Sequence, residues 1–270
     1  MTRGHSINTA TVACLCLLLG STVAAARLHA KTAQAFDAYV KAAEQQMVSG
    51  ISDPDFVWLL DGETSRGRLT NGEILIRPAD KAKVPDGLLH DWTGTMFVKG
   101  VSVDDVVATL LDFDRHHAVY PEVTESRILE TNGGVSHTYL RIKRKKIVTV
   151  VYNTEHNLQP FRPTEDRWYS ISRSTKIAQV DNAGEQGEKE LPVGDDSGYL
   201  WRLNAYWRLE AGAGGTFVSL RAISLSRGIP FGLGWLVKPF VKGLPRESLM
   251  ATLEGTREAV LDPSYTAPAQ

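Results

Sequence analysis

The chain has 270 residues, 43% of them hydrophobic, with 30 Lys and Arg against 31 Asp and Glu and a formal net charge of −1. These values are typical of a soluble globular protein and argue against disorder, a collagen-like fibre and a multi-span membrane protein. A near-neutral charge also argues against a protein that a general positive field holds on nucleic acid. The two cysteines, Cys14 and Cys16, both lie near the N-terminus.

Residues 1–26 have the pattern of a secretory signal peptide: Arg3 precedes a short apolar core at 12–19, and small residues follow up to Ala26. We expect cleavage near Ala26, which leaves a periplasmic or secreted chain without disulfides or thiolate chemistry. The alternative is an uncleaved N-terminal membrane anchor, because residues 6–26 carry no charge. The strongly apolar part is shorter than a bilayer requires.

Helix and strand patterns follow one another along the rest of the chain. Apolar residues repeat at helical spacing over 32–49 and predict an amphipathic helix docked on a core. A capped helix is expected at 102–113, and a C-terminal helix, interrupted at its prolines, at 230–261. Runs with strand character lie at 56–60, 69–77, 88–99, 123–130, 136–156, 166–180, 198–211 and 217–225. The acidic segment 183–198 is predicted to be a solvated loop.

These elements predict an α+β helix-grip fold, in which a curved antiparallel sheet wraps around a long C-terminal helix. Such a sheet must cover its apolar concave face, and the last helix is the element long enough to do so. A helix that covers a curved sheet leaves a cavity between them. The expected organisation is an N-terminal helical and β extension at 27–87, the sheet-and-helix domain at 88–262 and a flexible tail at 263–270.

Several strings make the chain resemble the helix-grip superfamily that includes START domains, polyketide cyclases and coenzyme-Q-binding proteins. They are WTGT at 92–95, LDFDR at 111–115, GYLWRLNAYWR at 198–208, ISLSR at 223–227 and GLGW at 232–235. The last three are similar to an exported bacterial branch. The resemblance implies a cavity for a lipid or another hydrophobic small molecule, and it implies no particular reaction and no cofactor.

One cluster of titratable residues follows the predicted helix at 102–113. Asp112, Asp114, His116 and His117 include the groups that acid–base catalysis or a metal site would use. The favoured interpretation is a solvated helix end, because His favours the negative end of the helix dipole. The sequence contains no zinc, P-loop, dinucleotide or serine-hydrolase motif, so no metal is predicted and the catalytic candidates are weak.

A basic run lies on one predicted strand. Arg141, Lys143 and Lys145 share one face of it, because side chains alternate along a strand. The run indicates either transient contact with an anionic membrane surface or protection of a strand edge. Nucleic acid is not an expected partner of an exported protein, and no protein partner is predicted.

The stretch 199–209 alternates aromatic and aliphatic residues with polar ones. Its polar residues, with arginines of neighbouring strands, are candidates to orient a ligand in an apolar pocket, and an outward, solvated position is the alternative. Aromatic residues at the start of the last helix are candidates for its core face or for a mobile mouth. The residues proposed as ligand contacts are Arg173, Arg202, Asn204, Arg221, Trp235 and Phe240.

The sequence therefore predicts an exported protein that binds or transfers a lipid or another hydrophobic small molecule. The first alternative is a cyclase-like or hydrolase-like enzyme that uses the cluster at 112–117. The second is a non-catalytic accessory protein of an envelope complex.

Overall fold

A computed structural model describes residues 26–53, 56–59, 61–79, 82–145, 149–228 and 234–265, with the backbone alone for 234–242. The predicted signal peptide up to residue 25 therefore lies outside the described residues, as do the side chains of Trp235 and Phe240.

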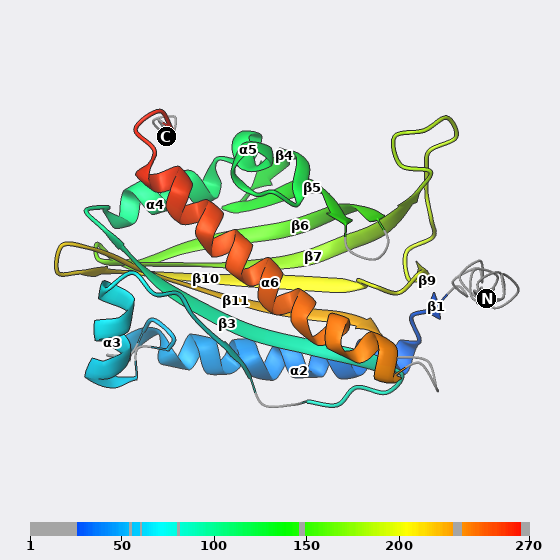
Figure 1. Cartoon of the computed structure of the whole chain (residues 1–270), viewed down its shortest axis with the longest axis horizontal. Coiled ribbons are helices and arrows are strands. Elements are labelled where there is room, and N and C mark those ends of the chain that lie inside the picture. Colours follow the sequence, from blue (N-terminus) through cyan, green and yellow to red (C-terminus); the bar gives the residue numbers. More distant parts are fainter. Residues whose placement is uncertain are drawn as a thin grey trace, which may run out of the picture.

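A long antiparallel sheet forms the body of the chain (Figure 1). The larger sheet follows the order β2-β3-β11-β10-β7-β6-β5-β4, with β8 paired to β7, and a second small sheet joins β1 to β9. The strands are β1 (Ala26–Arg27), β2 (Leu75–Pro78), β3 (Gly87–Lys99), β4 (Val123–Asn132), β5 (Val135–Lys145), β6 (Thr149–Thr164), β7 (Arg167–Asp181), β8 (Lys189–Glu190), β9 (Asp195–Asp196), β10 (Arg202–Gly212) and β11 (Gly215–Arg227).

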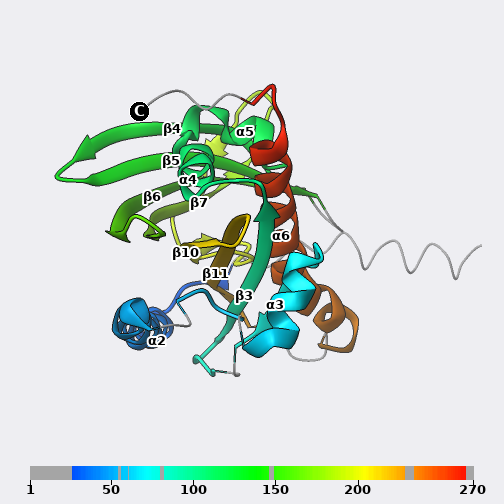
Figure 2. The same ribbon diagram turned by 90° about the vertical axis from the view of Figure 1, so that its left-hand side faces the viewer.

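Helices cover both faces of the central strands. Figure 2 shows the sheet between α2 (Ala30–Ser49) on one side and α6 (Gly234–Leu261) on the other. We call the face toward α6 the inward face and the face toward α2 the outward face. The shorter helices are α3 (Gly62–Thr70), α4 (Val103–Leu111) and α5 (His116–Val119), and the 3-10 turns are η1 (Gly50–Ser52) and η2 (Phe113–Arg115).

Alternation along the strands divides the core in two. On the inward face, Leu209, Val218 and Met96 are buried together with Leu249 and Leu253 of α6. On the outward face, Tyr206, Ile223 and Leu225 are buried with the apolar stripe of α2, which comprises Phe36, Val40, Ala43 and Met47. The helix-grip architecture predicted from the sequence is confirmed, and the N-terminal extension adds a helix to the second face of the sheet.

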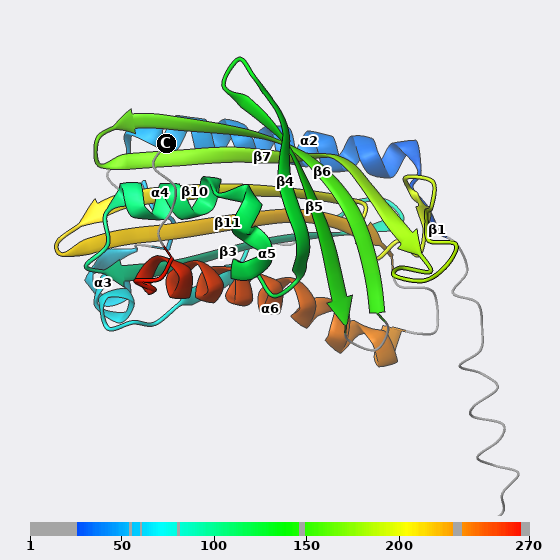
Figure 3. The ribbon, with the colours of Figure 1, turned by 90° about the horizontal axis from the view of Figure 1, so that it is seen from above.

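The helix α4 begins as its sequence predicts. The hydroxyl of Ser102 accepts a hydrogen bond from the backbone N–H of Asp105, and the Asp105 carboxylate accepts one from the Ser102 N–H in return. This reciprocal cap satisfies donors that the first turn leaves free. Figure 3 shows α4 and α5 on the same side of the sheet as α6.

Several predicted elements are corrected by the structure. Of the strand expected at 56–60, the described residues 56–59 are irregular backbone, with Leu59 at a φ of 62°, and the first part of 69–77 belongs to α3. The stretch 136–156 forms two strands, β5 and β6, rather than one. The helix α6 runs from Gly234 to Leu261 without the interruptions expected at its prolines.

Candidate ligand-binding face of the sheet

The inward face is tightly packed at the end of the sheet next to α4. Trp168, Leu209, Val218 and Met96 lie side by side on four neighbouring strands, and all four are at most 4% exposed. At Gly94 the helix approaches so closely that an added Cβ would lie 2.5 Å from Cδ1 of Leu253. This end of the face has no room for a ligand.

Small residues replace large ones farther along the same strands. Ser172, Ala205 and Ala222 are direct neighbours across β7, β10 and β11, and Ser174 and Ser224 follow in the next positions of β7 and β11. All five lie on the inward face, yet all are partly exposed. We call this set the small-residue floor (Ser172, Ser174, Ala205, Ala222 and Ser224). Their partial exposure means that other side chains do not pack closely over the floor.

Larger apolar side chains surround the small-residue floor. Trp92 pairs with Ala222 across the β3–β11 ladder, Leu203 precedes Ala205 along β10 and Trp207 follows it. All three side chains are partly exposed on the inward face. The result is an apolar surface with aromatic walls, which is the usual lining of a pocket for a hydrophobic ligand.

Uncharged polar groups border the small-residue floor. The hydroxyl of Ser170, opposite Trp207, is buried and has no hydrogen-bond partner among the described residues. A buried hydroxyl without a partner costs about 1–3 kcal/mol. Such a group is a position where a polar atom of a ligand would regain a hydrogen bond.

His156 borders the floor beside Ser174 on the neighbouring strand. Its Nε2 lies 3.1 Å from the hydroxyl of Thr154, which itself donates to the Leu140 carbonyl. Because that hydroxyl has used its proton, Nε2 carries the imidazole hydrogen and Nδ1 keeps a lone pair. Burial lowers the pKa of His156 to about 4, so the ring is neutral at pH 7.

The four polar residues predicted to contact a ligand lie on the opposite face. Arg221 forms a bidentate ion pair with Asp91, with Nε–Oδ1 and Nη2–Oδ2 distances of 2.9 and 2.6 Å. The same Asp91 accepts a hydrogen bond of 2.7 Å from the Tyr39 hydroxyl of α2. Burial and this carboxylate raise the pKa of Tyr39 to about 12. The prediction for Arg221 is wrong, because its side chain fastens α2 to the sheet.

The other three polar candidates are also used within the protein. Arg173 forms a bidentate pair with Glu44 of α2, at 2.7 and 2.8 Å. Asn204 accepts from the Ser174 N–H and donates to the Tyr206 hydroxyl, and Arg202 donates to the Trp201 carbonyl. The sequence therefore identified polar residues that share a face, and they take the outward position that it offered as the alternative to ligand contact.

Arg208 is the most deeply buried arginine of the outward face. It donates to the carbonyls of Met47 at the end of α2 and of Phe56, and its guanidinium lies over the Trp58 ring. Burial lowers its pKa to about 10. A cavity of about 10 Å³ beside it has room for one water molecule and is too small for a lipid.

The titratable cluster at 112–117 does not converge on one point. His116 is buried between Phe113 and Tyr120 and binds the Leu110 carbonyl through Nε2, whereas Asp114 and His117 are exposed. Asp112 accepts a hydrogen bond from the Tyr265 hydroxyl. The solvated helix end of the alternative interpretation therefore describes Asp114 and His117, while Asp112 and His116 are buried, and a shared acid–base site is not supported.

His116 is expected to make stability depend on pH. Burial lowers its pKa from 6.5 to about 4, so between these values the unfolded chain binds the proton more readily and stability falls on acidification. From pH 7 to pH 5 this one group removes about 2 kcal/mol of unfolding free energy. Urea denaturation at pH 7 and pH 5 measures this fall in unfolding free energy. In His116→Phe the fall should be smaller than in the wild type by this amount. The exposed neighbour provides the control His117→Phe, and equal losses in both variants would contradict the assignment.

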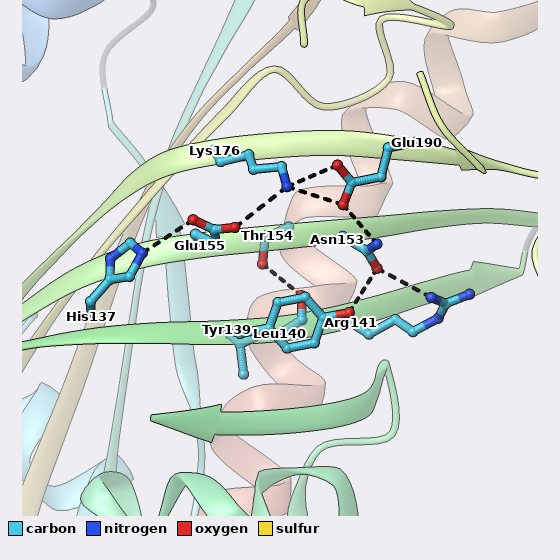
Figure 4. Close-up of polar contacts among 9 residues, drawn as sticks. All are labelled: His137, Tyr139, Leu140, Arg141, Asn153, Thr154, Glu155, Lys176 and Glu190. Carbon is cyan, nitrogen blue, oxygen red and sulfur yellow. Dashed lines mark hydrogen bonds and ion pairs between the residues drawn. The ribbon is translucent and has the colours of Figure 1, made fainter. Parts of the chain in front are cut away.

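The basic strand is partly neutralised on the outward face. Arg141 donates to both carboxylate oxygens of Glu188 at 3.0 and 2.8 Å. Figure 4 shows Asn153 and Lys176 bound to Glu190. The acidic segment is therefore attached to the sheet rather than free in solvent, and Arg141 is not available to an anionic surface. Lys143 and Lys145 are exposed, and their contact with a membrane stays a prediction.

The described ranges were searched for metal-binding groups and for helices that could cross a membrane. Within them, no three His, Cys, Asp or Glu side chains are grouped so that they could hold a metal ion. None of the helices seen there combines the length and the apolar character needed to cross a membrane.

No protein-family model matches the sequence, and no curated protein matches it. Solved structures align with parts of the chain. A STAR-related lipid transfer protein from Xanthomonas axonopodis is 18% identical, covers 69% of this chain and 99% of its own, and has a TM-score of 0.44. The Zhui aromatase/cyclase from Streptomyces is 14% identical, covers 64% of this chain and 93% of its own, and has a TM-score of 0.43. Human STARD10 is 11% identical, covers 79% of this chain and 79% of its own, and has a TM-score of 0.45. The likeness to these START-type and cyclase structures concerns the fold alone.

Proposed function

We propose that the chain binds or transfers an uncharged hydrophobic molecule, such as a neutral lipid, over the small-residue floor. The observation that carries the proposal is the partial exposure of Ala205, Ala222, Trp92 and Trp207 on the face of the sheet that packs against α6 at Leu249 and Leu253. Side chains of this kind are normally buried when they face the inside of a domain. A ligand in this space would bury them and gain about 25 cal/mol for each Å² of apolar surface removed from water.

The polar groups at the floor favour a ligand without charge. Ser170, Ser172 and Ser174 offer hydroxyls, and the neutral His156 offers a lone pair. The arginines of β7, β10 and β11 at 173, 202, 208 and 221 are all on the outward face, so they do not compensate an anionic group placed at the floor. A carboxylate or phosphate at the floor would be desolvated with none of these four arginines beside it, which is costly. Hydroxyl and carbonyl groups fit these partners instead.

Tryptophan quenching tests where the ligand binds. The protein is incubated with vesicles that contain a dibrominated diacylglycerol, separated from them, and its fluorescence is measured. We expect quenching in the wild type, and a smaller quenched intensity in Trp207→Phe, because Trp207 lies beside the floor. Trp58 lies on the outward face beside Arg208, so Trp58→Phe is the matched control and should quench like the wild type. A reduction in the control alone would place the ligand on the wrong face for this proposal.

A further inference from the structure

The first strand of the structure begins at the predicted cleavage region. Ala26 is opposite Asp196 and Arg27 is opposite Asp195 in the β1–β9 ladder. The N–H of Leu28 donates to the Gly194 carbonyl at 2.6 Å. Hydrogen-bonded pairs alternate with non-hydrogen-bonded pairs in an antiparallel ladder, so the pair two positions away, Ala26 with Asp196, is again a hydrogen-bonded one. The backbone nitrogen of Ala26 is thereby directed at Asp196.

Asp196 is an acid buried beside this nitrogen. Its residue is 2% exposed, and Oδ1 accepts hydrogen bonds from the Gly198 N–H at 2.5 Å and from Nε1 of Trp201 at 3.2 Å. Oδ2 is buried without a hydrogen-bond partner among the described residues. A carboxylate oxygen left alone in this way is costly, and a cation next to it removes the cost.

Arg227 also influences this carboxylate, and Oδ2 still has no hydrogen-bond partner among the described residues. Arg227 lies close enough to lower the pKa of Asp196, but burial raises that pKa more. Its guanidinium lies over the Tyr199 ring, 5.4 Å from the centroid. A further cation at Oδ2 would therefore complete the site.

We propose that the chain is processed by hydrolysis of the Ala25–Ala26 peptide bond, and that the new α-ammonium group of Ala26 binds Asp196. Water supplies the hydroxyl that joins the Ala25 carbonyl carbon, and the released nitrogen of Ala26 takes up protons to become an ammonium. An endopeptidase that selects small residues would cleave here, because Val23 and Ala25 precede the bond at the two positions that such enzymes read. Of the three ammonium hydrogens, one continues the ladder and the others reach the carboxylate.

The structure distinguishes this bond from the neighbouring one after Ala26, which the sequence favoured. The Ala26 side chain packs with the outward core, and an added Cβ on Gly198 would lie 2.9 Å from its Cβ. Cleavage after Ala26 would remove this contact and the pair with Asp196. It would also place the new ammonium on Arg27, opposite Asp195, which is exposed.

The test uses the full chain expressed in an exporting bacterial host. Intact mass and N-terminal sequencing of the exported protein should give Ala26 as the first residue. At pH 7 an acylating reagent should modify the α-amine at least tenfold more slowly than in Asp196→Asn, because an ion pair raises the pKa of the amine above its usual value of about 8. Asparagine keeps an acceptor for Gly198 and Trp201, so this variant retains the hydrogen bonds of Oδ1.

Asp195→Asn is the matched control, since Asp195 is an exposed neighbour on the same strand. Its α-amine should react at the wild-type rate. A first residue other than Ala26, an uncleaved chain, or equal reactivity in the wild type and Asp196→Asn would each overturn the proposal. None of these readouts involves a ligand, so they are independent of the proposed function.

Discussion

Asp91→Ala is expected to lower the unfolding free energy by about 3–5 kcal/mol, because it leaves a buried guanidinium without its partner. The side chains of Asp91 and Arg221 are only 2% and 14% exposed, so water does not replace the lost carboxylate. The same change removes the acceptor of the Tyr39 hydroxyl, which holds α2. Urea denaturation followed by circular dichroism measures the loss.

Two further variants separate the ion pair from the hydrogen bond. Asp91→Ala combined with Arg221→Met removes both charges, so it should lose less stability than Asp91→Ala alone. Tyr39→Phe removes one hydroxyl and should cost about 1 kcal/mol. A loss below about 1 kcal/mol for Asp91→Ala would show that the pair does not hold the outward face together.

Ala205→Trp is expected to abolish ligand uptake, with at least a tenfold drop in bound molecules per chain. Ala205 lies in the middle of the small-residue floor, between Ser172 and Ala222, and an indole there would occupy the space above it. Because Ala205 is partly exposed, the larger side chain meets open space rather than a packed core, and stability should change little. Uptake is measured by extraction and mass spectrometry after incubation with vesicles.

Ala42→Trp is the matched control for this substitution, because Ala42 is exposed on α2 at the other face. It should take up as much ligand as the wild type. Wild-type uptake by Ala205→Trp would mean that the ligand lies elsewhere.

The local sequence pattern was sufficient to predict the helices and strands whose apolar residues repeat at a strong period. The stripe Phe36, Val40, Ala43 and Met47 predicted α2, and the alternation around Trp207 correctly separated the two faces of β10. By contrast, α3 was missed because its sequence GETSRGRLT contains a single large apolar residue, Leu69. The helix depends on contacts with the rest of the chain, which a local pattern does not record.

The candidate site was harder to predict than the fold. Alternation shows which side chains share a face of a strand, but it does not show which face the long helix covers. Here α2 buries the face of β10 that carries Asn204 and Arg208, and the other face is the partly exposed one. The better signal was the set of small residues at inward positions, such as Ala205 and Ala222, among larger apolar ones. Recognising it requires the register between strands, which only the structure supplies.

Native mass spectrometry of the delipidated chain tests ligand binding most directly. The protein is incubated with vesicles that contain diacylglycerol, phosphatidylcholine and phosphatidylglycerol. It is then repurified, and the mass of the protein with its bound molecules is measured. The uncharged, apolar floor predicts one molecule of diacylglycerol per chain, and its loss in Ala205→Trp. A chain that carries no lipid, or one that carries phosphatidylglycerol alone, would contradict a site for neutral hydrophobic molecules beneath α6.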